Sequence, residues 1–260
     1  ILTCAASAQP LDRQLLDQIG LDQNLDAQMP LDLTFTDEKG RTVAIGDFLG
    51  DRPALLALVY YECPMLCTQI LNGLLRSLRV LSFDVGKEFD VITVSIDPGE
   101  TPSLAAAKKE EYVKRYGRVS ADRGWHFLTG RQDQIERLAQ AVGFRYQNDP
   151  ETGLYLHASG IMVLTPEGKL ARYFYGVDYA PKDVRLGLIE ASHNKIGSAV
   201  DQLLLLCYQY DPSTGKYGLV IMNSLRIAGG LTVVTMVSFI VLMLRRERRE
   251  KPHVTAGPPA

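Results

Sequence analysis

The sequence predicts an α/β domain built on a mixed β-sheet with flanking helices, followed by a single membrane-spanning helix. Three observations support this fold class. Continuous apolar runs at 54–61 (ALLALVYY) and 89–96 (FDVITVSI) are typical of buried central strands. Segments with helical periodicity alternate with these strands, which is the order expected of a sheet covered by helices. Near the end of the chain, Ile227–Leu244 contains no charged residue.

Composition excludes several classes of protein. The chain has 260 residues, of which 46% are hydrophobic and 22% charged, so a folded domain is expected rather than disorder. A net charge of −2 argues against a nucleic-acid partner. The four cysteines, Cys4, Cys63, Cys67 and Cys207, are too few and too scattered for a disulfide scaffold.

The expected elements follow one another in a simple order. An N-terminal hairpin at 31–35 and 42–45, with Gly40 in its turn, comes first. Three strand–helix pairs follow, and a second hairpin and a last helix end the domain. A mixed sheet closed by an antiparallel hairpin is typical of the thioredoxin-like arrangement. After the first hairpin, strands are expected at 54–61, 89–96, 125–128, 144–146, 160–164 and 170–175, and helices from Pro64, at 101–116, at 131–142 and at 181–193.

The segment between the first of these strands and its helix carries the most informative residues. Cys63 and Cys67 lie four residues apart, and Pro64 suits the first position of a helix because its missing N–H is not needed there. Residues four apart share a helix face, so both sulfurs can point to one place. The helix N-terminus also lowers a thiol pKa and favours the thiolate. Two converging thiolates form either a soft-metal site or a reducible disulfide, and two buried core cysteines are the alternative.

The four histidines differ in their positions relative to this pair. His157 is expected in a loop just before the strand at 160–164, from which its side chain can reach toward the cysteine-bearing helix. On pattern alone, a lone histidine in a loop is more often an ordinary surface residue. His126 falls in a strand, His193 ends a helix where its charge suits the dipole, and His253 lies in the C-terminal tail.

The C-terminal part of the sequence predicts a membrane anchor. Ile227–Leu244 is long enough, at about 1.5 Å per residue, to cross a bilayer, and the basic run Arg245–Lys251 follows at once. The positive-inside rule places this tail in the cytoplasm. The expected location is therefore the bacterial inner membrane, crossed once, with the large N-terminal part on the periplasmic side.

The remaining segments complete the expected organisation. Leu2-Thr3-Cys4-Ala5 loosely resembles a lipoprotein cleavage site, in which Cys4 would carry a lipid; otherwise Cys4 belongs to a leader or a flexible end. Cys207, in an apolar stretch, is interpreted as a buried structural thiol. The expected divisions are an extension at 1–29, the thioredoxin-like domain at 30–193, a membrane-proximal extension and linker at 194–224, a transmembrane helix at 225–245 and a cytoplasmic tail at 246–260.

Taken together, these motifs resemble the Sco/SenC family. The resemblance is carried by YYECPMLC at 60–67, by VSIDPGETP at 94–102, and by His157, which lies 90 residues beyond Cys67. Its CxxxC spacing differs from the CxxC of thioredoxin itself. The resemblance covers about Pro30–Glu190. It implies a membrane-anchored, thioredoxin-like copper protein that helps to metallate the binuclear copper centre (CuA) of cytochrome c oxidase.

The resemblance also implies the site and the partner. The copper ligands would be Cys63, Cys67 and His157, binding Cu⁺ or Cu²⁺, and the partner would be oxidase subunit II or a related respiratory complex. Thiolate suits Cu(I) and imidazole suits Cu(II), so this set serves both oxidation states. The chain departs from the family pattern in its C-terminal rather than N-terminal anchor. It also has Leu156 and Ala158 beside the histidine, where the family often has Asp and Ser, which removes an acidic neighbour that would orient the imidazole.

Two other functions remain open from the sequence. Cys63 and Cys67 can serve as the catalytic dithiol of a thiol–disulfide reductase that keeps oxidase cysteines reduced. In that case the protein would be an enzyme, whereas a copper chaperone would not be one. Alternatively, the chain is a non-catalytic accessory subunit of a respiratory complex that docks through its C-terminal helix and the 197–217 segment.

Overall fold

The computed structural model describes residues 18–62, 66–149, 152–195, 210–211, 216–217 and 219–250. The chain divides into two compact units, Ile1–Ser198 and Ala199–Ala260. The finer divisions expected from the sequence stay predictions. Several residues that the sequence singled out lie outside the described residues: Cys4, Cys63, Cys207, His253 and most of the 197–217 segment.

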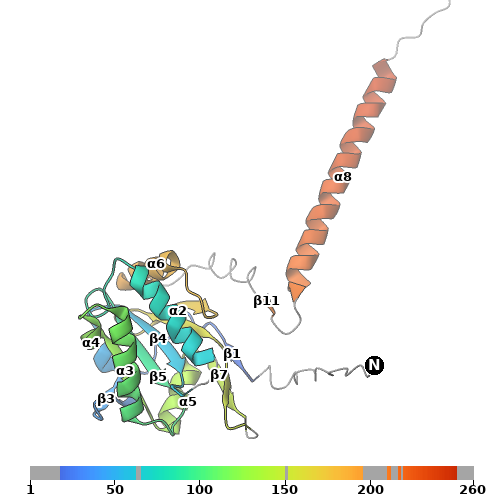
Figure 1. Ribbon diagram of the computed structural model, residues 1–260. Coiled ribbons are helices and arrows are strands. Elements are labelled where there is room, and N and C mark those ends of the chain that lie inside the picture. Colours follow the sequence, from blue (N-terminus) through green and yellow to red (C-terminus); the bar gives the residue numbers. More distant parts are fainter. Residues whose placement is uncertain are drawn as a thin grey trace, which may run out of the picture. The chain divides into compact units, whose positions relative to one another are not determined.

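A five-stranded mixed sheet forms the centre of the first unit, and it confirms the predicted α/β class. Its strand order is β10-β9-β4-β5-β6 (Figure 1). The three strands β4, β5 and β6 run parallel, β9 is antiparallel to β4, and β10 is antiparallel to β9. All residues of β4 and β5 are buried, as expected for central strands covered on both faces. The bounds are β4 Ala54–Val59, β5 Asp90–Ser95, β6 Trp125–Leu128, β9 Gly160–Leu164 and β10 Leu170–Tyr175.

Three helices lie together on one face of this sheet. Helix α2 (Leu66–Val80) lies between α3 (Pro102–Tyr116) and α6 (Pro181–Ser192) and packs against both of them (Figure 1). The apolar stripe that predicted α2 from the sequence is the face that it buries. Its buried members are Ile70, Leu71, Leu74, Leu75 and Leu78.

Local signals set the ends of α3 as the sequence predicted. The Thr101 hydroxyl accepts a hydrogen bond from the Leu104 N–H, which satisfies one of the amide groups left open at a helix start. Gly117 ends the helix with a φ of 79°, a left-handed conformation that glycine adopts without strain. A short helix that the sequence did not predict, α4 (Ala121–Gly124), then leads into β6.

Two smaller sheets flank the central one. Strands β2 (Thr34–Thr36) and β3 (Thr42–Ala44) form the predicted N-terminal hairpin, and the 3-10 helix η1 (Ile45–Phe48) follows it. The other small sheet has the order β1-β7-β8 and is antiparallel throughout. Its strands are β1 Gly20–Leu21, β7 Phe144–Asn148 and β8 Tyr155–His157, and helix α5 (Gln132–Ala141) packs against β7.

The position of His157 corrects the sequence interpretation. We expected a loop there, whereas His157 is the last residue of β8 and pairs with Tyr146 of β7. A three-residue strand is too short to show an alternating pattern. Its pairing also depends on a partner strand that the sequence does not identify.

The described residues of the second unit form a two-stranded hairpin and one long helix. Strands β11 (Tyr210–Asp211) and β12 (Lys216–Tyr217) pair antiparallel, and helix α8 runs over Leu219–Glu250. Over the described residues, no helix combines the length and the apolar character needed to cross a membrane. The membrane span expected at Ile227–Leu244 is not supported by this finding and stays a prediction from the sequence.

Candidate functional site

The chain leaves the central sheet at the carboxyl end of β4, just before the Cys63–Cys67 segment. Tyr60 and Tyr61 follow β4 directly, and both are buried. The Tyr61 hydroxyl lies 2.8 Å from the carbonyl oxygen of Leu128 and 3.1 Å from that of Thr93, which anchors this residue across the ends of β5 and β6. Ligand sites of open α/β sheets lie at the carboxyl ends of strands, so the segment begins where a site is expected.

The two cysteines are placed only in part. Cys67 is the second residue of α2 and lies in its first turn, whereas the sequence placed it one turn into a helix beginning at Pro64. Its side chain lies outside the described residues, as does Cys63. The structure describes the chain up to Glu62 and again from Leu66, together with the residues around these two positions.

The structure brings His157 to the start of this segment. The centre of its ring lies 6.1 Å from that of Tyr60, edge to face, and 5.6 Å from that of Phe144. Tyr60 precedes Cys63 by three residues in the sequence. Pairing of β8 with β7 therefore places an imidazole from a distant part of the chain beside the residues that lead into the cysteine motif.

A backbone carbonyl orients this imidazole. The Nδ1 atom of His157 lies 2.8 Å from the carbonyl oxygen of Ala158, which can only accept, so Nδ1 carries the proton and Nε2 carries the lone pair. Burial lowers the pKa of His157, and the bond to Ala158 opposes this shift. A neutral imidazole held through one nitrogen is the form that ligates metals. The Ala158 carbonyl thus orients the imidazole of His157, in place of the acidic neighbour that the sequence lacks.

The donor types predicted from the sequence suit a soft metal. Two thiolates and one imidazole match the preferences of copper in both of its common oxidation states. Among the side chains that the structure describes, no three His, Cys, Asp or Glu residues gather closely enough to hold a metal. The side chains of Cys63 and Cys67, the two predicted sulfur ligands, are not among the described ones, so this finding does not concern them.

One residue near the motif was missed by the sequence reasoning. In the sequence, Glu100 stands out only as a member of VSIDPGETP, yet its carboxylate accepts hydrogen bonds from the Glu62 N–H and from the Ser95 hydroxyl. Burial raises the pKa of Glu100, and the bonds from Ser95, Tyr61 and Glu62 oppose this shift. The sequence signal was its place in VSIDPGETP, a loop that follows β5 at the same edge of the sheet as the cysteine motif.

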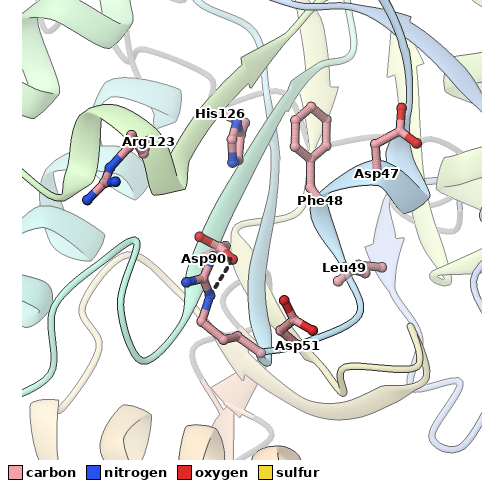
Figure 2. A pocket seen from close by; sticks show the side chains of 8 residues that line it. Asp47, Phe48, Leu49, Asp51, Asp90, Arg123 and His126 are labelled. Carbon is pink, nitrogen blue, oxygen red and sulfur yellow. Dashed lines mark hydrogen bonds and ion pairs between the residues drawn. The ribbon is translucent and has the colours of Figure 1, made fainter.

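A cavity of about 200 Å³ lies at the opposite edge of the sheet, where β4, β5 and β6 begin (Figure 2). Its lining includes Asp90, the first residue of β5, and Arg52, which form an ion pair with an N–O distance of 3.0 Å. His126 of β6 also lines it, and its ring lies 4.0 Å from that of Phe48. His126 therefore lies at the end of the sheet opposite to the cysteine motif, packed against Phe48.

His126 makes the stability of the domain depend on pH. Burial, helped by the charges of Lys109 and Arg52 and opposed by Glu38 and Asp37, lowers its pKa to about 4. The unfolded chain takes up this proton near pH 6.5, so stability is complete above that pH and falls as the pH drops toward 4.

We expect replacement of His126 by phenylalanine to remove part of this pH dependence. Between pH 7.5 and pH 5, the wild-type protein should lose about 2 kcal/mol more unfolding free energy than the variant. Urea unfolding at a series of pH values measures the difference. Contributions from His157 and the carboxylates are present in both proteins and cancel, so equal pH profiles would contradict the assignment.

The fold and the surroundings of the motif define a class of protein: a thioredoxin-like α/β domain with a Cys-x-x-x-Cys segment entering a helix and a histidine beside its start. The SCO1/SenC family model matches residues 22–186, and the chain belongs to this family.

Individual relatives agree with this assignment. The SCO1 protein homolog of Bacillus subtilis (strain 168) is 28% identical over 155 residues, which cover 58% of this chain and 75% of that protein. A crystal structure from Aquifex aeolicus VF5, of a protein with a proposed role in electron transfer, matches with a TM-score of 0.58 at 27% identity and covers 65% of this chain and 95% of its own. Arabidopsis thaliana ScoI with copper bound shares the fold, with a TM-score of 0.50 at 18% identity over 62% of this chain and 96% of its own.

Proposed function

We propose that this protein binds copper through Cys63, Cys67 and His157 and delivers it to the CuA centre of a cytochrome c oxidase during assembly of the respiratory complex. One observation carries the proposal. The imidazole of His157 packs against Tyr60, three residues before Cys63, and its Nδ1 is committed to the Ala158 carbonyl, so that Nε2 is the nitrogen suited to a metal. Family membership and the copper held by the Arabidopsis relative support the same reading.

The chemistry of this ligand set suits a carrier. Two thiolates and an imidazole leave a coordination position through which a ligand of the acceptor can enter. The partner is then subunit II of the oxidase, whose copper centre receives the metal, or a related respiratory complex. Oxidation of the two thiols to a disulfide would remove two ligands at once, so copper loading depends on the redox state of the pair.

Copper titration of the reduced full chain tests the site. The wild-type protein should bind one copper ion, with an X-ray absorption spectrum that shows two sulfur neighbours and one nitrogen. Cys63→Ser and Cys67→Ser should each abolish tight binding, and His157→Ala should weaken it and remove the nitrogen neighbour. Loss of a group that only orients a metal ligand typically costs about tenfold to a hundredfold in metal affinity, so loss of a ligand itself should cost about a hundredfold or more.

The control is Cys207→Ser, which removes a thiol outside the proposed ligand set and should leave copper binding unchanged. Zinc in place of copper, or copper binding that survives Cys63→Ser, would contradict the site. Delivery is tested separately by mixing the copper-loaded chain with the metal-free CuA domain of oxidase subunit II and following the absorption of that centre. Copper that stays on the chain would contradict delivery.

A second function, thiol–disulfide exchange, is favoured by the place of Cys67 in the first turn of α2. A helix N-terminus stabilises a thiolate, and a reactive thiolate is what a reductase of oxidase cysteines requires. This activity should need both cysteines and tolerate His157→Ala, whereas copper binding should need all three residues. Reduction of a disulfide peptide by His157→Ala at the wild-type rate, together with no copper bound to the wild-type chain, would favour the reductase.

The cellular location stays a prediction from the sequence. The basic run Arg245–Lys251 supports a cytoplasmic tail, with the N-terminal domain on the periplasmic side of the inner membrane. Protease treatment of spheroplasts tests it: the domain should be digested and a tag after Ala260 should be protected. Recovery of the whole chain in the soluble fraction would contradict the location.

A further inference from the structure

Glu100 ties the chain that enters the cysteine motif to the neighbouring loop. Its Oε1 atom accepts a hydrogen bond from the backbone N–H of Glu62 at 2.8 Å. The hydroxyl of Ser95 donates to its Oε2 atom at 2.5 Å, and the backbone of Tyr61 also bonds the carboxylate. Both carboxylate oxygens therefore accept hydrogen bonds: Oε1 from Glu62, the residue before Cys63, and Oε2 from Ser95, the last residue of β5.

The turn that carries Glu100 is itself braced. The Asp97 side chain accepts from the Gly99 N–H at 2.8 Å, and the Ser95 hydroxyl oxygen accepts from the Asp97 N–H at 3.1 Å. Thr101, the next residue, caps helix α3. The carboxylate therefore projects from a turn that is fixed to β5 at one end and to α3 at the other, and it has little freedom to move away from β4.

The bond to Glu62 lies just past the end of β4, where the hydrogen bonds of the central sheet no longer hold the chain. Tyr61 is held by its buried ring and hydroxyl, but Glu62 is exposed, and β4 has already ended at Val59. Among the described residues, the Glu100 carboxylate is the hydrogen-bond partner that the structure gives for the Glu62 N–H. The next peptide unit leads directly into Cys63.

We propose that Glu100 is a positioning residue for the Cys63–Cys67 pair: its carboxylate fixes the backbone before Cys63 and so sets how the Cys63 sulfur is presented to copper or to a disulfide. The copper part of this inference rests on the proposed function. The thiol part does not, because the backbone is held in the same way whether or not the protein carries a metal.

Variants of the full chain test the proposal. Glu100→Ala removes both bonds, whereas Ser95→Ala keeps the carboxylate and removes the hydroxyl that donates to it and that accepts from the Asp97 N–H. Glu100→Gln keeps an acceptor for the Glu62 N–H, so it should rescue much of the effect of alanine. The matched control is Asp47→Asn, because Asp47 makes a similar bond, at 2.9 Å, to the Ala44 N–H at a loop that does not lead to the cysteines.

Two readouts separate positioning from a general effect on folding. The first is the reduction potential of the Cys63–Cys67 pair in glutathione buffers, read by peptide mass mapping so that Cys4 and Cys207 do not contribute. The second is Cu(I) affinity in competition with a chelator. Glu100→Ala should shift the thiol–disulfide equilibrium constant at least threefold and weaken Cu(I) binding about tenfold or more. Ser95→Ala should follow in the same direction, and Asp47→Asn should change neither.

The outcomes are decisive in each case. Wild-type values for both readouts in Glu100→Ala would overturn the proposal, and so would equal shifts in Asp47→Asn. If the wild-type chain binds no copper, the proposed function fails while the thiol equilibrium still tests Glu100. If Glu100→Ala does not fold, Ser95→Ala and Glu100→Gln decide. A shifted reduction potential in Ser95→Ala together with a near wild-type potential in Glu100→Gln supports the proposal. An unshifted potential in Ser95→Ala overturns it.

Discussion

Replacement of Lys109 by methionine is expected to lower the free energy of unfolding by about 3–5 kcal/mol, because it leaves a buried carboxylate without its counter-charge. Lys109 Nζ lies 2.6 Å from Glu38 Oε1, and the two side chains are only 9% and 8% exposed. Glu38 belongs to the turn of the β2–β3 hairpin and Lys109 to α3, so this pair fastens the hairpin to the domain. Methionine keeps the apolar stem of lysine and removes only the charge.

Urea unfolding followed by tryptophan fluorescence measures the effect. Trp125 is the single tryptophan of the chain and is completely buried in the first unit. The matched control is Lys87→Met, whose ion pair with Asp84 has the same 2.6 Å distance but is 58% exposed on the lysine side. Loss of an exposed pair should cost much less, because solvent screens the two charges. Equal losses in both variants would contradict the role assigned to burial.

The double variant Glu38→Gln/Lys109→Met separates the two causes. If the loss in Lys109→Met comes from a stranded charge, removing the carboxylate as well should restore much of the stability. If the double variant is instead as unstable as the sum of the single variants, the pair contributes through packing and not through charge.

Gly73→Ala should destabilise the domain by about 2–3 kcal/mol, although alanine is the better helix former. Gly73 is buried within α2, and a Cβ atom there would overlap the backbone carbonyl of Val177 in the loop between β10 and α6. A backbone carbonyl cannot rotate away as a side chain does, so α2 itself would have to move. Because α2 carries Cys67, the change should also weaken copper binding.

Gly187→Ala in α6 provides the comparison for this prediction. Gly187 is also a buried helix glycine, but its Cβ would meet the side chains of Arg172 and Phe174 at 3.2 Å, which can yield. The helix propensity gained, about 1 kcal/mol, should roughly offset that adjustment. Thermal or urea unfolding of both variants tests the contrast, and a loss in Gly187→Ala as large as in Gly73→Ala would contradict the steric explanation.

Much of the fold followed from patterns within single segments. The apolar runs at 54–61 and 89–96 became β4 and β5, two residues shorter at one end for β4 and one residue shorter at each end for β5. Thr101 caps α3 as expected, because the capping signal is contained in a few consecutive residues. Short elements such as α4 and β8 were missed, because three or four residues do not establish a period.

The place of the candidate site in the fold was predictable from the sequence, whereas the groups that support it were not. The spacing of Cys63 and Cys67 and the following helix indicated a site at the carboxyl end of β4, and Cys67 does lie in the first turn of α2. The Ala158 carbonyl and the Glu100 carboxylate were not predicted, because their roles depend on the way in which β8 and the β5–α3 turn approach β4.

By itself, the sequence determined the α/β class, the spacing of the two cysteines and the family to which the chain belongs, since each is recognised from short motifs and patterns along the chain. Only the tertiary structure decided that His157 lies beside Tyr60 and that His126 belongs to the opposite edge of the sheet. The physical reason is that strand pairing joins segments far apart in the chain, and a shift of one residue in that pairing would turn each of these side chains to the other face.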